Sequence, residues 1–165
     1  MQEICAEARI SPGALYRYFG SKADIIAAIA EDERREADLA LRRVGAQGEL
    51  IEALCELARG FFGKVSGDGG MLLADVAAEA ARDQLLAKSL AVIDAQSLAH
   101  CAAAIEAAQV CGDVDANLDP VLASNILFAC IEGLGFRQSL LGVTSVDHAV
   151  AQFRAMAERF LAKRS

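Results

Sequence analysis

The side chains best suited to chemistry gather in one short segment near the N-terminus. Two phenolic hydroxyls and two cations fall within seven residues, on Tyr16, Arg17, Tyr18 and Lys22. The stretch 9–22 contains no acidic residue. Hydroxyls and cations at this density suit the phosphate oxygens of a nucleic-acid backbone. Because the formal net charge of the whole chain is −7, we expect any anion-binding surface to lie in this segment.

Two helix-start signals shape the segment. Ser11 followed by Pro12 places a capping hydroxyl ahead of a proline at the first helical position, which predicts a helix over residues 12–18. Ser21 and Asp24 are spaced as a capping box, which predicts that a longer helix begins directly after Ser21. The chain between these helices is so short that they must diverge sharply.

A short helix predicted over residues 2–8 completes a helix-turn-helix. The second helix of this motif lies in the major groove of DNA, with its first residues at the base edges. Gly13 and Ala14 keep the leading end of that helix narrow, which favours close approach to a duplex. The segment therefore predicts a DNA-binding head.

The rest of the chain is also predicted to be helical. The whole chain has 165 residues, 55% of them hydrophobic and only two of them proline, and no alternation of period two runs long enough to predict a strand. Residues 66–70 are the clearest loop. We expect an all-α fold with helices over 2–8, 12–18, 22–44, 49–65, 71–81, 83–110, 120–141 and 146–163.

Composition indicates a soluble cytoplasmic protein without a membrane partner. No basic stretch followed by an apolar run marks the N-terminus as an export signal. The five cysteines are an odd number, which argues against a disulfide framework. The apolar stretch 120–131 is stopped by Glu132, short of the roughly 18 residues that a membrane-spanning helix needs.

Nothing in the sequence predicts an enzyme, a metal site or a cofactor. The best candidate group is His100 and Cys101 with Cys111, but neighbouring helical residues point about 100° apart and no metal-type spacing recurs. No glycine-rich phosphate loop and no convincing pair of carboxylates for acid–base chemistry appears. We therefore predict neither catalysis nor a metal.

The run from Ile4 to Lys22 resembles the helix-turn-helix of the TetR-type transcriptional regulators. The most specific part is the pattern of tyrosine, any residue, tyrosine-phenylalanine, any residue and serine-lysine at 16–22. The resemblance implies that Leu15 and Phe19 are core and that Tyr18 and Lys22 contact phosphates. Together with Arg17, whose charge suits phosphate, the expected DNA-facing residues are Ser11, Pro12, Gly13, Tyr16, Arg17, Tyr18 and Lys22.

Three departures from the family pattern stand out. Arg9 occupies a turn position where the family usually has glycine, which costs roughly 1 kcal/mol if its backbone is left-handed. Ala14 replaces a common serine or threonine, so one polar DNA contact is absent. The family also has a complete helix before this motif, whereas the sequence starts inside the next one. Without that helix, we expect an uncovered apolar face and poor DNA binding.

The layout divides the chain into a DNA-binding domain over 1–45 and a second region over 46–165. The resemblance implies that this second region binds a ligand and dimerises through its last two helices, as a four-helix bundle. Apolar residues recur at helical spacing in both of these helices, which agrees with a dimer interface. The same pattern would arise if both helices packed inside one monomer. The expected interface residues are Val121, Leu134, Leu141, Ala149, Phe153, Met156 and Phe160.

A ligand pocket is expected between the helices that begin near residues 49, 71, 83 and 120. Its walls would be mostly apolar with a few polar groups, although each residue could equally be ordinary core. The candidates are Phe61, Phe62, Met71, Leu72, Val76, Leu90, Ile93, Gln96, His100, Phe128 and Phe136.

The resemblance implies a homodimeric TetR-type repressor that a small-molecule effector releases from a palindromic DNA operator. In that mechanism the ligand favours a conformation in which the long helix from Lys22 tilts and changes the separation of the two heads. The alternative is an all-α protein that binds small molecules or acts as a scaffold without binding DNA. The sequence does not identify the effector.

Overall fold

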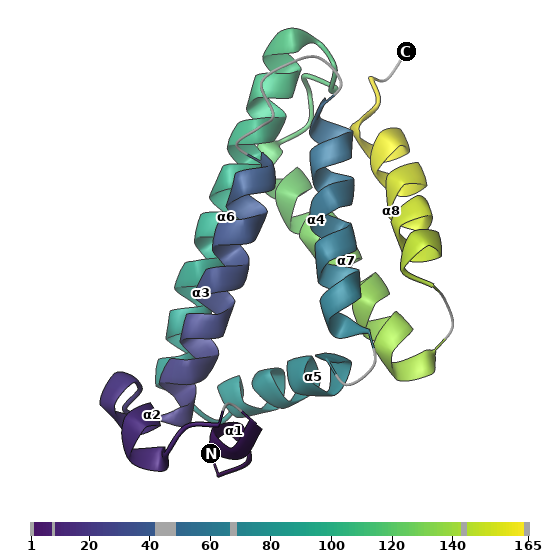
Figure 1. Ribbon diagram of the computed structural model, residues 1–165. Coiled ribbons are helices and arrows are strands. Elements are labelled where there is room, and N and C mark those ends of the chain that lie inside the picture. Colours follow the sequence, from purple (N-terminus) through teal and green to yellow (C-terminus); the bar gives the residue numbers. More distant parts are fainter. Residues whose placement is uncertain (1, 8, 42–48, 67–68, 143–144, 164–165) are drawn as a thin grey trace.

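The computed structural model describes residues 2–7, 9–41, 49–66, 69–142 and 145–163, which form eight helices and no strand (Figure 1). The predicted all-α class is confirmed. The helices are α1 (Gln2–Glu7), α2 (Pro12–Tyr18), α3 (Lys22–Leu41), α4 (Glu49–Val65), α5 (Gly69–Ala80), α6 (Gln84–Cys111), α7 (Pro120–Leu141) and α8 (Val146–Leu161).

Helix boundaries follow the capping residues. Asp83 begins α6 by accepting hydrogen bonds from the amides of Leu85 and Leu86, and Gly112 ends it in the left-handed conformation, φ +78°. The loop expected over 66–70 is shorter than predicted, because α5 already begins at Gly69. The expected domain boundary between residues 45 and 46 lies outside the described residues.

The long helices give the molecule its shape. α3 packs along α6, and α4 packs against both α7 and α8. Figure 1 shows α1 and α2 at the beginning of α3, while α5 lies across this same end of the molecule and leads into α6. The helix-turn-helix therefore lies beside the start of α6 and the end of α5.

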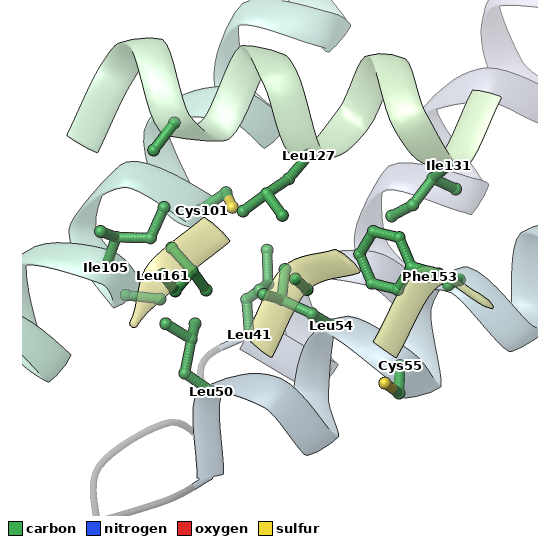
Figure 2. Packing of buried hydrophobic residues seen from close by; sticks show 14 of the residues in the cluster. Leu41, Leu50, Leu54, Cys55, Cys101, Ile105, Leu127, Ile131, Phe153 and Leu161 are labelled. Atoms are coloured by element: carbon green, nitrogen blue, oxygen red, sulfur yellow. The ribbon is translucent and has the colours of Figure 1, made fainter. Parts of the chain in front are cut away.

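Two hydrophobic cores hold these elements together. The larger one joins α3, α4, α6, α7 and α8, and its centre is fully buried (Figure 2): Leu54, Phe62, Cys101, Ile105, Leu127 and Phe153. The smaller one consists of Cys5, Leu15 and Ile25, with Phe19 packed against it. Helices of six and seven residues are unstable alone in water, so α1 and α2 depend on this small core and on α3.

Two isoleucines near the small core are not part of it. Ile10 and Ile29 have 40% and 48% of their surface exposed. Ile29 lies one turn beyond Ile25, and α1 and α2 are too short to cover α3 past its first turns. Ile10 lies in the turn that follows α1, outside the buried cluster.

Polar contacts tie α4 to the last two helices. Arg154 on α8 donates from its two terminal nitrogens to the two carboxylate oxygens of Glu52 on α4, each over 2.6 Å. This hydrogen bonding holds the pKa of Glu52 below its ordinary value. On α7, the Gln138 side-chain amide donates to Ser66 Oγ over 3.0 Å, and Ser66 Oγ donates to the Phe62 carbonyl.

α7 packs tightly against α4 at Gly135. A Cβ atom added there would lie 2.5 Å from Phe61 Cε1 and 3.1 Å from Val65 Cγ2. Gly60 on α4, by contrast, has nothing within 4 Å of such a Cβ. Gly135 is therefore required by packing.

We predict opposite effects of alanine at these two glycines. Both substitutions gain about 1 kcal/mol of helix propensity, but Gly135→Ala overpacks the α4–α7 contact at a cost of about 1–3 kcal/mol. Urea unfolding at a fixed protein concentration should show Gly60→Ala more stable than the parent and Gly135→Ala less stable. A stabilised Gly135→Ala variant would contradict the close packing.

Candidate nucleic-acid interface

The turn between α1 and α2 is fixed by backbone hydrogen bonds. The Ile10 amide donates to the Cys5 carbonyl over 3.0 Å, and the Arg9 amide donates to the Ala6 carbonyl over 3.2 Å. This is a Schellman motif, and Arg9 is its left-handed residue with φ +53°. Arg9 is therefore in the left-handed conformation that the sequence analysis considered for this position, where a residue with a Cβ atom is strained relative to glycine.

α2 begins as its capping residues predict. Ser11 Oγ accepts a hydrogen bond from the Ala14 amide over 3.2 Å, and Pro12 occupies the first turn. A Cβ atom added at Gly13 would meet nothing within 4 Å. The leading end of α2 is therefore open to an approaching partner.

The two faces of α2 differ sharply in burial. Leu15 is buried in the small core, whereas Arg17 is exposed and Tyr16 and Tyr18 have 52% and 78% of their surface exposed. Large aromatic side chains usually bury most of their surface. The two tyrosines instead lie on the solvent-exposed face of α2, whereas Leu15 lies on its buried face.

α3 starts beside this face. Ser21 Oγ accepts a hydrogen bond from the Asp24 amide over 3.1 Å, which confirms the serine half of the predicted capping box. Lys22, the first residue of α3, is exposed, and its Nζ lies 3.4 Å from Glu79 Oε2 on α5. No sequence pattern predicts this ion pair, because its partners are 57 residues apart.

The seven predicted DNA-facing residues form one exposed surface. All of them lie between the start of α2 and the first residue of α3, and each is exposed: Ser11, Pro12, Gly13, Tyr16, Arg17, Tyr18 and Lys22. This surface combines hydroxyl groups, cations and the open N-terminal end of α2. Such a set of groups suits both phosphate oxygens and the edges of bases.

The predicted ligand residues do not gather around one described cavity. Phe62 is fully buried in the large core, where it makes an edge-to-face contact with Phe61 at 6.4 Å between ring centroids. Gln96 and Phe136 are exposed. Met71 and Leu72 belong to α5, but their side chains are outside the described set. The others are half-buried: Phe61, Val76, Leu90, Ile93, His100 and Phe128.

The predicted dimer residues fall into two groups. Ala149 and Phe153 have 1% and 0% of their surface exposed, so they belong to the core of the chain rather than to its surface. They lie on the face of α8 that packs on α4, together with Ala157 and Leu161. Surface remains available at the other predicted positions: Val121, Leu134, Leu141, Met156 and Phe160.

A groove of about 770 Å³ runs between α7 and α8. Three of the predicted dimer residues line it, with two arginines and two small or polar residues: Leu134, Met156, Phe160, Arg137, Arg159, Gln152 and Ala155. None of the predicted ligand residues contributes to this groove. It is therefore a feature of the α7–α8 surface.

α7 also carries an exposed stripe that sequence reasoning missed. Six apolar or small residues repeat at alternating spacings of four and three and are all exposed: Leu122, Ile126, Ala129, Gly133, Phe136 and Leu140. This is the spacing of a helix that packs against another helix. The periodicity was visible in the sequence, but the inward face of α7 is equally apolar and masks it.

The stripe explains the composition of α7. By length and composition alone this helix could cross a membrane, although only 28% of its apolar window is buried. One face, with Ala123, Leu127 and Ile131, packs in the core, while the stripe faces outward. An apolar helix with one face in the core and another available for a partner needs no membrane.

Comparison with known proteins assigns the family. Residues 1–29 match the family model described as bacterial regulatory proteins, tetR family. Residues 71–163 match the model described as BetI-type transcriptional repressor, C-terminal. No match was found among curated proteins.

Solved structures share the fold. GusR of Salmonella enterica is 23% identical, with a TM-score of 0.74 over 98% of this chain and 83% of its own. A protein from Rhodococcus sp. assigned to the TetR family is 20% identical, with a TM-score of 0.76 over 97% and 86% of the two chains. A TetR transcription regulator from Haloarcula marismortui is 17% identical, with a TM-score of 0.72 over 97% and 84%.

The chain belongs to the TetR family and is a DNA-binding transcriptional regulator. The resemblance carried by residues 4–22 is confirmed. Members of this family regulate transcription and are generally not enzymes.

We predict that Arg9→Gly stabilises the head. Glycine relieves the left-handed strain of about 1–2 kcal/mol but adds freedom to the unfolded chain, so the net gain should be about 0.5–1 kcal/mol. The two tyrosines of the chain, Tyr16 and Tyr18, both lie in the head, and the chain has no tryptophan. Urea unfolding followed by tyrosine fluorescence therefore reports on this part.

Arg9→Ala is the matched control. Alanine removes the charge and the long side chain but keeps the Cβ atom that causes the strain, so it should bring no comparable gain. Equal stabilisation by both substitutions would assign the effect to lost charge instead of backbone strain.

Proposed function

We propose that this regulator is a repressor that binds a palindromic operator as a homodimer and leaves it when a small-molecule effector binds. The observation that carries the proposal is the division of α2 into a buried face at Leu15 and an exposed face at Tyr16 and Tyr18. A helix anchored on one side and open on the other suits insertion into the major groove.

Each exposed group has a proposed role at the duplex. Pro12 and Gly13, at the open start of α2, approach the base edges and contribute to sequence preference. Tyr18 and Lys22 contact phosphates, with Ser11, Tyr16 and Arg17 around them. The formal charge of −7 makes these local cations important, because the rest of the chain repels a polyanion.

We predict that Lys22→Met weakens binding to all DNA sequences. One phosphate contact is lost per head, so a dimer should lose about tenfold in affinity at low salt, and the slope of log K against log salt should fall by about 2. Fluorescence anisotropy with the DNA upstream of the protein's own gene, and with an unrelated duplex, measures both quantities.

Lys163→Met is the control with the same change of charge. The end of α8 lies at the opposite end of the molecule from the helix-turn-helix (Figure 1), and Lys163, two residues beyond it, is exposed. The Lys163→Met variant should leave the slope of log K against log salt unchanged. Equal slopes for Lys22→Met and the parent protein would remove Lys22 from the interface.

The proposed dimer uses α7 and α8. The exposed stripe on α7 supports this role, because a large unpartnered apolar surface on a soluble protein marks an interaction site. The adjoining groove with Leu134, Met156 and Phe160 extends the apolar area onto α8. Two copies related by a two-fold axis would bring the two stripes together as a four-helix bundle.

We predict that Leu140→Arg breaks the dimer without unfolding the chain. Leu140 has 60% of its surface exposed in the single chain, so arginine is tolerated there, whereas a charge in the bundle interface costs several kcal/mol if buried unpaired. Analytical ultracentrifugation should show a monomer with unchanged helical circular dichroism.

Val110→Arg is the matched control for this experiment. Val110 is an apolar residue on α6 with 89% of its surface exposed. It lies outside the α7 stripe and the α7–α8 groove, so this variant should stay dimeric. A dimeric Leu140→Arg protein would exclude the α7 stripe from the interface.

The effector is proposed to act through α6 and α3. These two helices pack along each other, so a ligand that shifts α6 also shifts the helix that begins at Lys22. The half-buried residues of the predicted pocket are the proposed contacts: Phe61, Val76, Leu90, Ile93, His100 and Phe128. A ligand acts this way only if it binds the two conformations with different affinity. As regulators of this kind are soluble DNA-binding proteins, we place it in the cytoplasm.

A further inference from the structure

One ion pair joins the proposed DNA surface to the second region of the chain. Lys22 Nζ lies 3.4 Å from Glu79 Oε2, and both side chains are about half exposed. Lys22 is the first residue of α3, and Glu79 lies in the last turn of α5. The cation proposed to contact a phosphate is therefore already held by a carboxylate when DNA is absent.

The electrostatics of the two helix ends favour this pair. The N-terminus of a helix carries partial positive charge and the C-terminus partial negative charge. Lys22 at the start of α3 and Glu79 at the end of α5 are each at the unfavourable end of their own helix. Each side chain is opposed by its own helix and attracted by the other, so the contact stabilises both ends together.

Glu79 is also held in place by its backbone. Its carbonyl oxygen accepts hydrogen bonds from the amides of Arg82 and Asp83, each over 2.9 Å. Asp83 in turn caps α6 through the amides of Leu85 and Leu86. The corner between α5 and α6 thus fixes the position from which the carboxylate reaches Lys22.

We propose that Glu79 is an internal competitor of DNA, occupying Lys22 in the free protein and lowering operator affinity. The proposal rests on the function given above, in which Lys22 contacts a phosphate. Binding requires the Lys22 ammonium to exchange a carboxylate for a phosphate oxygen. Part of the attraction gained from DNA is then offset by the attraction lost within the chain.

The expected size of the effect is modest and measurable. An exposed ion pair changes an equilibrium by a factor of about three, and a dimer has two such pairs, so Glu79→Gln should tighten operator binding about tenfold. The gain should shrink as salt is raised, because exposed charges are screened within about 10 Å at 0.1 M salt.

The experiment is a double-mutant cycle on the full chain, measured by fluorescence anisotropy at three salt concentrations. It compares the parent protein with Glu79→Gln, Lys22→Met and the double variant, using the same upstream DNA. Asp75→Asn is the control, because Asp75 is an exposed acid one turn earlier on α5. Glu79→Gln should bind more tightly than the control at low salt and should bring no extra gain in the Lys22→Met background.

The outcomes separate the competitor from the proposed function. If Glu79→Gln and Asp75→Asn tighten binding equally, or if the gain persists without Lys22, Glu79 acts only by general repulsion of DNA and the competition is excluded. If Lys22→Met itself leaves affinity and salt slope unchanged, the proposed phosphate contact fails instead. Circular dichroism that shows Glu79→Gln as fully folded as the parent at the temperature of the binding assay excludes an effect through stability.

Discussion

The packing of α3 against α6 is the constraint on which the rest of the structure depends. α3 contributes Ile25 to the small core beneath the helix-turn-helix and Leu41 to the large core of the second region. One rigid helix therefore belongs to both parts, and its first residue is Lys22. The orientation of the exposed tyrosines relative to the rest of the chain follows from how α3 lies on α6.

α7 also has two apolar faces that point in different directions. Its inner face supplies Leu127 and Ile131 to the large core, and Gly135 allows α4 to approach closely. Its outer face bears the apolar stripe that we assign to a second copy of the chain. A helix with an apolar face toward the core and a second apolar face toward solvent has no wide polar side, so its composition alone does not distinguish the two faces.

The sequence predicted the parts of this molecule that depend on local chemistry. Capping at Ser11 and Ser21 and the order of the helices follow from neighbouring residues, and the structure contains them. Predictions that depended on which segments pack together were less accurate. Phe153 was expected at an interface and is core, because periodicity shows that a helix has an apolar face but not which neighbour covers it.

Contacts between distant segments lay beyond sequence reasoning altogether. Glu79 has no motif around it, and only the fold brings it to Lys22. The sequence says least about which residues contact a ligand, because half-buried apolar side chains such as Ile93 and Phe128 have the same pattern in a core and in a pocket. Such residues can be told apart only by the space around them.

The small size of the core under the helix-turn-helix has a thermodynamic consequence. Among the described residues, the small core holds Cys5, Leu15 and Ile25, and α1 and α2 have six and seven residues, so the described part of the head has few buried contacts of its own. Any molecule that binds only the ordered form adds to the stability of that form in proportion to the logarithm of its concentration over Kd. In the proposed function, operator DNA that binds the ordered head would therefore add to its stability, to an extent set by the DNA concentration relative to Kd.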